Sequence, residues 1–174
     1  MASAPSLPLT RKIDVERLPQ NGDTIRIDAS AEERAALAAD FDLPGVQELI
    51  GLFEVTGGPK RVHVKGQVRA QVTQVCGVTL EPFEASVLED VDVVLAPATP
   101  AKSPEEEERR KIDPPDEIVD GRIDLGALTA EFLALGLDPY PRKPGVVFEP
   151  PESAEADSPF AALRGLGDSG GERS

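Results

Sequence analysis

The sequence contains very few of the residues on which most catalytic and metal sites depend. Its 174 residues include one cysteine (Cys76), one histidine (His63), one tyrosine and no tryptophan. A single thiol excludes a disulfide within the chain, and a zinc site of Cys and His ligands lacks its donors. A Ser-His-Asp or Cys-His arrangement would depend on His63 alone. The composition therefore argues against an enzyme built on familiar motifs, and we expect no catalytic residue, cofactor or metal.

Long apolar segments are also lacking. No run approaches the roughly 18 apolar residues of a membrane-spanning helix. The first residues, MASAPSLPLTRK, lack the apolar centre of a secretory signal. A lone cysteine fits a reducing compartment. We therefore expect a soluble cytoplasmic protein with no membrane partner.

Basic residues are scarce relative to acidic ones. Lys and Arg number 18 against 32 Asp and Glu, which gives a formal net charge of −14. A uniformly acidic surface repels nucleic acid and anionic lipid and suits a basic protein partner. We expect no binding to DNA.

Three segments carry too little apolar surface to support a packed core. We expect a disordered N-terminus (1–9), a flexible acidic loop (98–118) and a disordered tail (149–174), with residues 10–148 forming one domain. Within the tail, residues 158–163 (SPFAAL) form a short apolar motif. This motif either folds on a partner as a short helix or is an inert local cluster.

The strongest structural signal is a period-two alternation from Val62 to Leu80, which is typical of a strand with one buried face. A second alternating run, Glu84–Leu95, completes a long antiparallel hairpin whose connection lies within residues 77–82. Gly66 marks a bulge or a bend. Shorter strands are predicted at the positions Ile13–Val15 and Thr24–Ile27, joined by a turn, and as a final edge strand at Val146–Phe148.

Two short amphipathic helices are predicted. Ser30 and Glu33 form a capping box for the first, which runs to about Asp40 and directs Leu37 and Phe41 inward. Asp124 caps the second, whose apolar stripe is Leu125, Leu128, Phe132 and Leu135. Strands and helices are segregated along the chain. We therefore predict an α+β fold, an antiparallel β-sheet with a long hairpin packed by the two helices.

The candidate site is a basic stripe inside the acidic chain. No Asp or Glu lies between Glu54 and Glu81, and the alternation directs a row of polar side chains, with Gln67 and Gln71 among them, to the solvent face of one strand. The candidate residues of this row are Arg61, His63, Lys65 and Arg69. This stripe either contacts RNA phosphates or a partner, or pairs across strands with Glu84, Asp90 and Asp92. No aromatic residue alternates with these side chains, so a base-stacking platform is absent.

Cys76 occupies an inward position near the end of the same strand. A buried free cysteine usually behaves as a small apolar residue, and this interpretation competes with a reactive or metal-binding thiol. His63 points outward beside cations, so a surface or RNA-contacting role is favoured over catalysis.

An ordered set of short motifs resembles a known family. The motifs are Cys76–Phe83 (CGVTLEPF), 123–128 (IDLGAL), 137–144 (LDPYPRKP) and 159–163 (PFAAL). Together they resemble the YceD family, also called large ribosomal RNA subunit accumulation protein, in a form similar to those of alphaproteobacteria. Many relatives carry Cys-x-x-Cys before Leu-Glu-Pro, whereas this chain has Thr79 at the second position. No metal or redox role of that pair is therefore carried over.

The resemblance implies a bacterial cytoplasmic protein, without known enzymatic activity, that supports accumulation of large-subunit ribosomal RNA. Two mechanisms remain open. The protein shields a basic ribosomal protein, or its stripe docks on precursor rRNA. A small-molecule-binding protein or an enzyme with an unrecognised pocket is the alternative from another class.

Overall fold

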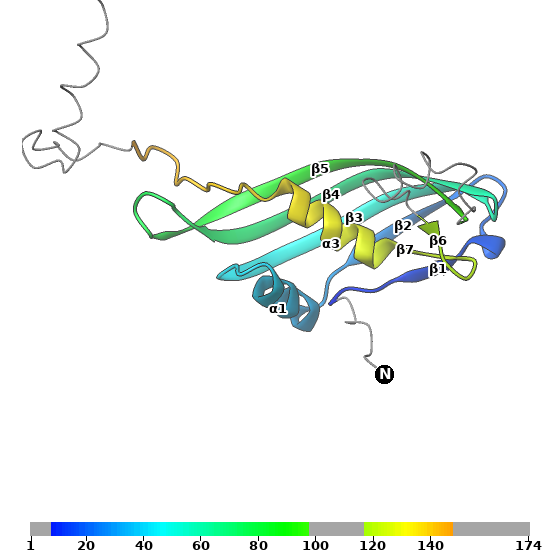
Figure 1. Ribbon diagram of the computed structural model, residues 1–174, viewed down its shortest axis with the longest axis horizontal. Coiled ribbons are helices and arrows are strands. Elements are labelled where there is room, and N and C mark those ends of the chain that lie inside the picture. Colours follow the sequence, from blue (N-terminus) through cyan, green and yellow to red (C-terminus); the bar gives the residue numbers. More distant parts are fainter. Residues whose placement is uncertain (1–7, 98–116, 148–174) are drawn as a thin grey trace, which may run out of the picture. The chain divides into compact units, whose positions relative to one another are not determined.

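The computed structural model describes residues 8–97 and 117–147 (Figure 1). The chain up to Lys143 forms one compact unit, and residues 144–174 form a second. Of the second unit, Pro144–Val147 are described and lie in no helix or strand, so the edge strand predicted there is wrong for Val146 and Val147. Phe148, the predicted tail with its 158–163 motif and the loop up to residue 116 lie outside the described residues.

The first unit is an α+β fold, as the sequence predicts. A five-stranded sheet has the order β2-β3-β4-β5-β6, and β1 and β7 form a separate two-stranded sheet. All pairs are antiparallel except β5 with β6. The elements in chain order are β1 (Lys12–Asp14), the 3-10 turn η1 (Val15–Arg17), β2 (Asp23–Asp28), α1 (Ala31–Asp40), β3 (Gly45–Gly58), β4 (Arg61–Val75), β5 (Pro82–Pro97), β6 (Glu117–Ile118), β7 (Arg122–Asp124) and α3 (Leu125–Gly136).

The predicted long hairpin is formed by β4 and β5, which pair continuously from Val62 opposite Leu95 to Val75 opposite Pro82. The Cys76 amide donates to the Glu81 carbonyl at 2.9 Å and closes the turn. Gly66 does not mark a bulge, because the β3–β4 register passes through it without a shift. A side chain is excluded there instead, since a Cβ on Gly66 would lie 2.0 Å from the Leu52 carbonyl oxygen.

Both predicted helix caps are present. Ser30 and Glu33 form the reciprocal capping box of α1, and Leu37 is fully buried while Phe41 is half-buried. The Asp124 carboxylate accepts the amides of the first turn of α3. The prediction that Leu135 faces inward is wrong, because its side chain is 68% exposed. Leu133, eight positions after Leu125, lies on the buried stripe instead, where helical periodicity places it.

Nonlocal pairing also changes several boundaries. The two early strand predictions do not pair with each other, because β1 pairs with β7 and β2 with β3. Leu9 falls within the predicted disordered N-terminus but is fully buried in the core. Residues 117 and 118 fall within the predicted flexible loop but form β6. No element was expected over the residues of β3, although β3 is one of the longest strands.

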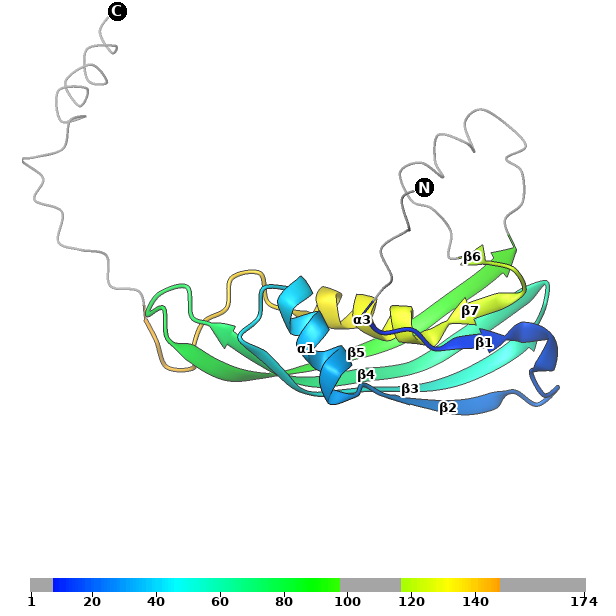
Figure 2. The same ribbon diagram turned by 90° about the horizontal axis from the view of Figure 1, so that it is seen from below.

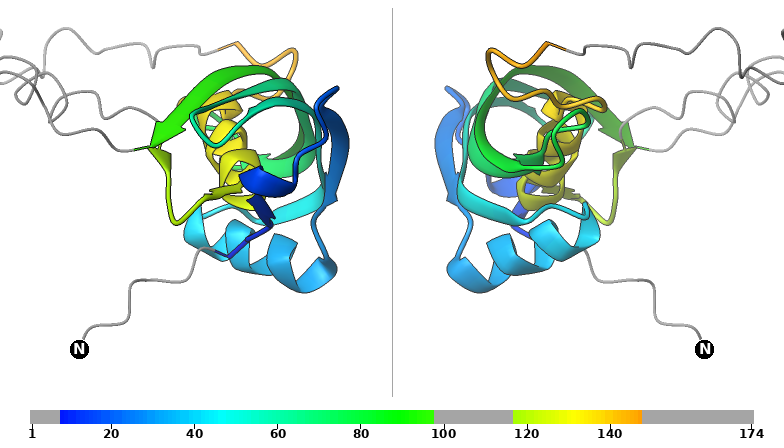
Figure 3. Two further views of the ribbon diagram at one scale, coloured as in Figure 1. Left: turned by 90° about the vertical axis from the view of Figure 1, so that its right-hand side faces the viewer. Right: turned by 90° about the vertical axis from the view of Figure 1, so that its left-hand side faces the viewer.

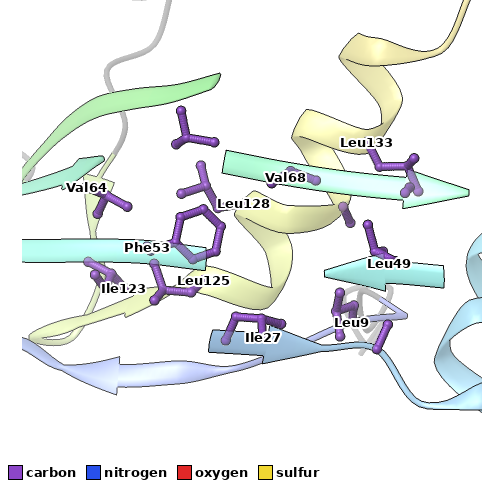
Figure 4. Close-up of a cluster of buried hydrophobic side chains, with 14 of the residues drawn as sticks. Leu9, Ile27, Leu49, Phe53, Val64, Val68, Ile123, Leu125, Leu128 and Leu133 are labelled. Atoms are coloured by element: carbon purple, nitrogen blue, oxygen red, sulfur yellow. The ribbon is translucent and has the colours of Figure 1, made fainter. Parts of the chain in front are cut away.

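The core lies between the five-stranded sheet and α3, which follows the concave face of that sheet (Figures 2 and 3). Figure 4 shows Phe53 of β3 beside Leu125 and Leu128 of α3, and all three side chains are buried. The side of the sheet opposite α3 is called the outer face below. In the part of the chain that the structure describes, no helix covers it (Figure 3). Among the described residues, no helix therefore hides the outward side chains of β2, β3, β4 and β5.

Candidate functional site

The four candidate residues line one strand of the outer face. They occupy alternate positions on β4 and so project to the same side, as the alternation predicts. Their neighbours come from β3 and β5, which flank β4 over its length. Lys65 lies between Glu54 and Asp92, whereas Arg69 lies between Ile50 and Leu88.

One acid on β5 contacts two of the candidate residues. The Asp92 Oδ2 atom lies 3.2 Å from Lys65 Nζ, and its Oδ1 atom lies 2.6 Å from His63 Nε2. These contacts lower the pKa of Asp92, first through the hydrogen bond with His63 and then through that with Lys65. Asp92 therefore stays ionised and neutralises the middle of the stripe. For Lys65 and Asp92, the predicted cross-strand pairing is confirmed.

The predicted pairing of the stripe with Asp90 and Glu84 is wrong for the described residues, because neither acid makes an ion pair with a cation of the stripe. Asp90 accepts a hydrogen bond from Gln67 at 2.8 Å, and Glu84 lies opposite Thr73. Arg69 contacts an acid from the other side, with its Nη2 atom 3.7 Å from Glu48 Oε1. Within the described residues, the Arg61 side chain makes no ion pair. The stripe is thus partly neutralised by both neighbouring strands.

A hollow of about 180 Å³ lies at the centre of the outer face, and no sequence pattern indicated it. Its apolar floor includes buried Ile50, while Leu52 and Leu88 beside it are 50% and 65% exposed. The Arg26 guanidinium at its edge is held by two hydrogen bonds to Asp28, at 2.7 and 3.0 Å. We define the central patch by the residues that line this hollow: Arg26, Ile50, Leu52, Gln67, Arg69 and Leu88.

Cys76 lies at the hairpin turn, away from the central patch. It is fully buried, as predicted, but its surroundings are polar rather than apolar. Its sulfur accepts the Lys143 amide at 3.4 Å, and this bond, together with bonds from the Thr79 hydroxyl and amide, lowers the pKa of the thiol to about 6. A second bond, from the Gly77 amide to the Pro141 carbonyl at 2.9 Å, holds the same two segments together. Cys76 therefore acts as a hydrogen-bond acceptor that fastens residues 141–143 to the turn.

The outer face combines exposed leucines, guanidinium groups and paired charges, which are features of a surface that binds another macromolecule. The fold belongs to the α+β class. Residues 64–166, more than half of the chain, match the model of the YceD family, described as large ribosomal RNA subunit accumulation protein. The chain belongs to the YceD family, as its motifs predict.

The family description implies a role in the accumulation of large-subunit ribosomal RNA, and it describes an accumulation factor rather than a known enzyme. No curated protein and no solved structure gives a significant match to this chain. Among the described residues, neither helix has the length and apolar character needed to cross a membrane.

Proposed function

We propose that this protein supports large-subunit rRNA accumulation in the cytoplasm by binding a basic ribosomal protein on the outer face of its sheet, without catalysing a reaction. The observation that carries this proposal is the pairing of Lys65 with Asp92 and of Arg69 with Glu48. An RNA phosphate would have to compete with these carboxylates for each cation. A protein partner can satisfy cations and acids together.

The central patch supports the same proposal. Leu52 and Leu88 present exposed apolar surface, and Arg26 and Arg69 lie beside them. Protein interfaces typically have an apolar centre enriched in arginine and a polar rim. The net charge of −14 adds long-range attraction for a basic partner. In this account, Arg69 lines the patch and Arg61, His63 and Lys65 follow it along β4. These four residues add little affinity for a basic partner, which binds mainly through the apolar and acidic side chains of the face.

Direct contact with precursor rRNA is the second candidate function. It is favoured by two exposed cations at the start of β4. Arg61 follows Lys60, both side chains are exposed, and neither makes an ion pair within the described residues. Two adjacent free cations suit a phosphate group.

The two candidates are separated by a triple variant, Arg61→Ser with Lys65→Ser and Arg69→Ser. We would measure its binding to a purified Lys/Arg-rich large-subunit ribosomal protein and to a precursor large-subunit rRNA fragment over a range of salt concentrations. If the ribosomal protein is bound through apolar and acidic contacts, the triple variant should bind it with nearly the affinity of wild type. RNA binding predicts weaker RNA affinity and a salt slope reduced by about one for each lost phosphate contact.

A matched variant checks the role of the apolar centre. Leu52→Ser with Leu88→Ser removes exposed apolar surface without altering charge, so the protein-binding proposal predicts a large loss of affinity for the ribosomal protein. If wild type does not bind the ribosomal protein, or if only the triple variant loses binding, the proposal is wrong.

A further inference from the structure

The two edges of β5 differ in their hydrogen bonding. From Pro82 to Leu95 one edge pairs with β4, whereas β6 pairs with the other edge only at Ala96 and Pro97. Alternate residues of an antiparallel strand direct their amide and carbonyl groups away from the partner strand. Within the described residues, the groups directed away from β4 between Pro82 and Leu95 make no hydrogen bond. This open edge is long compared with the edge at the other side of the sheet, where β2 has six residues.

The side chains along this edge are acidic or uncharged. β5 contains no lysine or arginine, and its acids are Glu84, Glu89, Asp90 and Asp92. Leu88 and Val94 on the outer face are 65% and 40% exposed. Two copies of such an acidic edge repel each other, which disfavours self-pairing of the sheet. The same charges attract an extended segment rich in lysine and arginine.

We propose that the open edge of β5, from Pro82 to Leu95, binds an extended Lys/Arg-rich segment of the partner by β-strand addition. The inference rests on the proposed function, because it assigns part of the basic ribosomal protein to a particular edge. Main-chain hydrogen bonds supply affinity, and side chains at alternate positions supply specificity. The added strand lies about 4.8 Å from β5.

The alternation of β5 also defines the kind of segment. The outward positions of β5 are Glu84, Ser86, Leu88, Asp90, Asp92 and Val94. An incoming strand therefore places three of its alternate side chains beside acids, which favours lysine or arginine at those three positions. On the other face, β5 presents buried Val87 and Val91, with the half-buried Glu89 between them. Small side chains are therefore favoured at the intervening positions beside the two valines.

The test uses the full chain and a synthetic peptide of alternating lysine and threonine that matches the edge in length. The control peptide has the same side chains but is methylated at every backbone nitrogen, so it keeps its charge and cannot donate to β5. Binding is measured at fixed ionic strength, and hydrogen exchange then locates the protected amides. We expect protection between residues 83 and 94 and an affinity at least about tenfold weaker for the methylated peptide.

Two double variants, each lacking two acids, distinguish an effect of the charges on β5 from an effect of net charge. Glu84→Gln with Asp90→Asn removes two acids from β5, whereas Glu48→Gln with Glu54→Gln removes two acids from the outer face of β3, which has no open edge. We expect the first variant to lose several-fold in peptide affinity and the second to change by less than about twofold.

Three results would overturn the inference: equal binding of the methylated peptide, protection confined to another segment, or equal effects of the two double variants. If the intact ribosomal protein still binds in those cases, the edge assignment fails and the proposed function stands. If neither the peptide nor the ribosomal protein binds, both fail.

Discussion

Lys65 on β4 lies directly opposite Asp92 on β5, and its ammonium nitrogen is 3.2 Å from the Asp92 carboxylate. This pair explains how a basic stripe exists in a chain of net charge −14. Lys65 and Arg69 are matched to acids on the neighbouring strands, whereas Arg61 at the start of β4 makes no ion pair within the described residues. The outer face therefore carries both signs of charge around an apolar centre.

Removing the matching acids should turn the outer face into an RNA-binding surface. We expect Asp92→Asn with Glu48→Gln to bind RNA more tightly than wild type, with a steeper salt dependence, because Lys65 and Arg69 are then released. Filter binding at several salt concentrations measures this. Glu32→Gln with Glu131→Gln removes the same charge from the two helices and should have a smaller effect. Equal gains in both variants would mean that net charge, rather than pairing, governs RNA binding.

The ion pair between Arg11 and Glu33 should make stability depend on acid pH. Their side chains share two hydrogen bonds, at 2.7 and 2.9 Å, and these lower the pKa of Glu33 to about 2. A carboxyl whose folded pKa is depressed contributes stability that is present above its usual value of 4.5 and is lost as pH falls toward 2.

The test variant is Glu33→Gln, which keeps a side chain able to complete the capping box. We expect it to lower the free energy of unfolding by about 0.5–1 kcal/mol at pH 7, since the pair is partly exposed. The difference should shrink toward zero near pH 2 in urea titrations. A difference that persists unchanged at pH 2 would show that the ion pair is not its cause.

Gly66 should tolerate no side chain. A Cβ there meets the backbone carbonyl of Leu52, which moves only if β3 and β4 separate. We expect Gly66→Ala to destabilise the fold by about 1–3 kcal/mol. Gly58 lies in open space on the neighbouring strand, so Gly58→Ala should be nearly neutral. Chemical denaturation compares the two, and equal losses would refute close strand approach as the reason.

Cys76 should contribute stability that grows with pH. Its folded pKa of about 6 lies below the ordinary thiol value of 9.0, so its contribution is full above pH 9 and is lost as pH falls toward 6. We expect the melting temperature of wild type to rise relative to that of Cys76→Ser across this range. Parallel melting curves for the two proteins would show that the thiolate does not fasten the turn to residues 141–143.

Local signals in the sequence are sufficient to predict the helix starts and the long hairpin. The first turn of α1 is capped by Ser30 and Glu33, and that of α3 by Asp124. The capping bonds reach only amides within three residues, so each cap can be predicted from the local sequence alone. The β4 alternation is regular because the side chains on one face of that strand are buried on both sides of the half-buried Gly66. The position of the candidate stripe on the outer face follows directly from this alternation.

The features that the sequence analysis missed depend on contacts between distant segments. β3 escapes a period-two pattern because its register shifts between Val46 and Glu48, and because Leu49, Ile50 and Gly51 are buried consecutively. Without β3, the Glu48 partner of Arg69 and the central patch could not be placed. The pairing of β1 with β7 joins segments more than a hundred residues apart and has no local signature.

The account's central claim is that this protein supports large-subunit rRNA accumulation through a protein partner on its outer face. The most direct measurement is to deplete the protein in its host, restore either wild type or the Leu52→Ser/Leu88→Ser variant, and quantify both subunit rRNAs. We predict a selective fall in large-subunit rRNA on depletion, rescue by wild type and by the Arg61→Ser/Lys65→Ser/Arg69→Ser variant, and no rescue by the leucine variant. Unchanged rRNA levels on depletion, or full rescue by a folded leucine variant, would contradict the account.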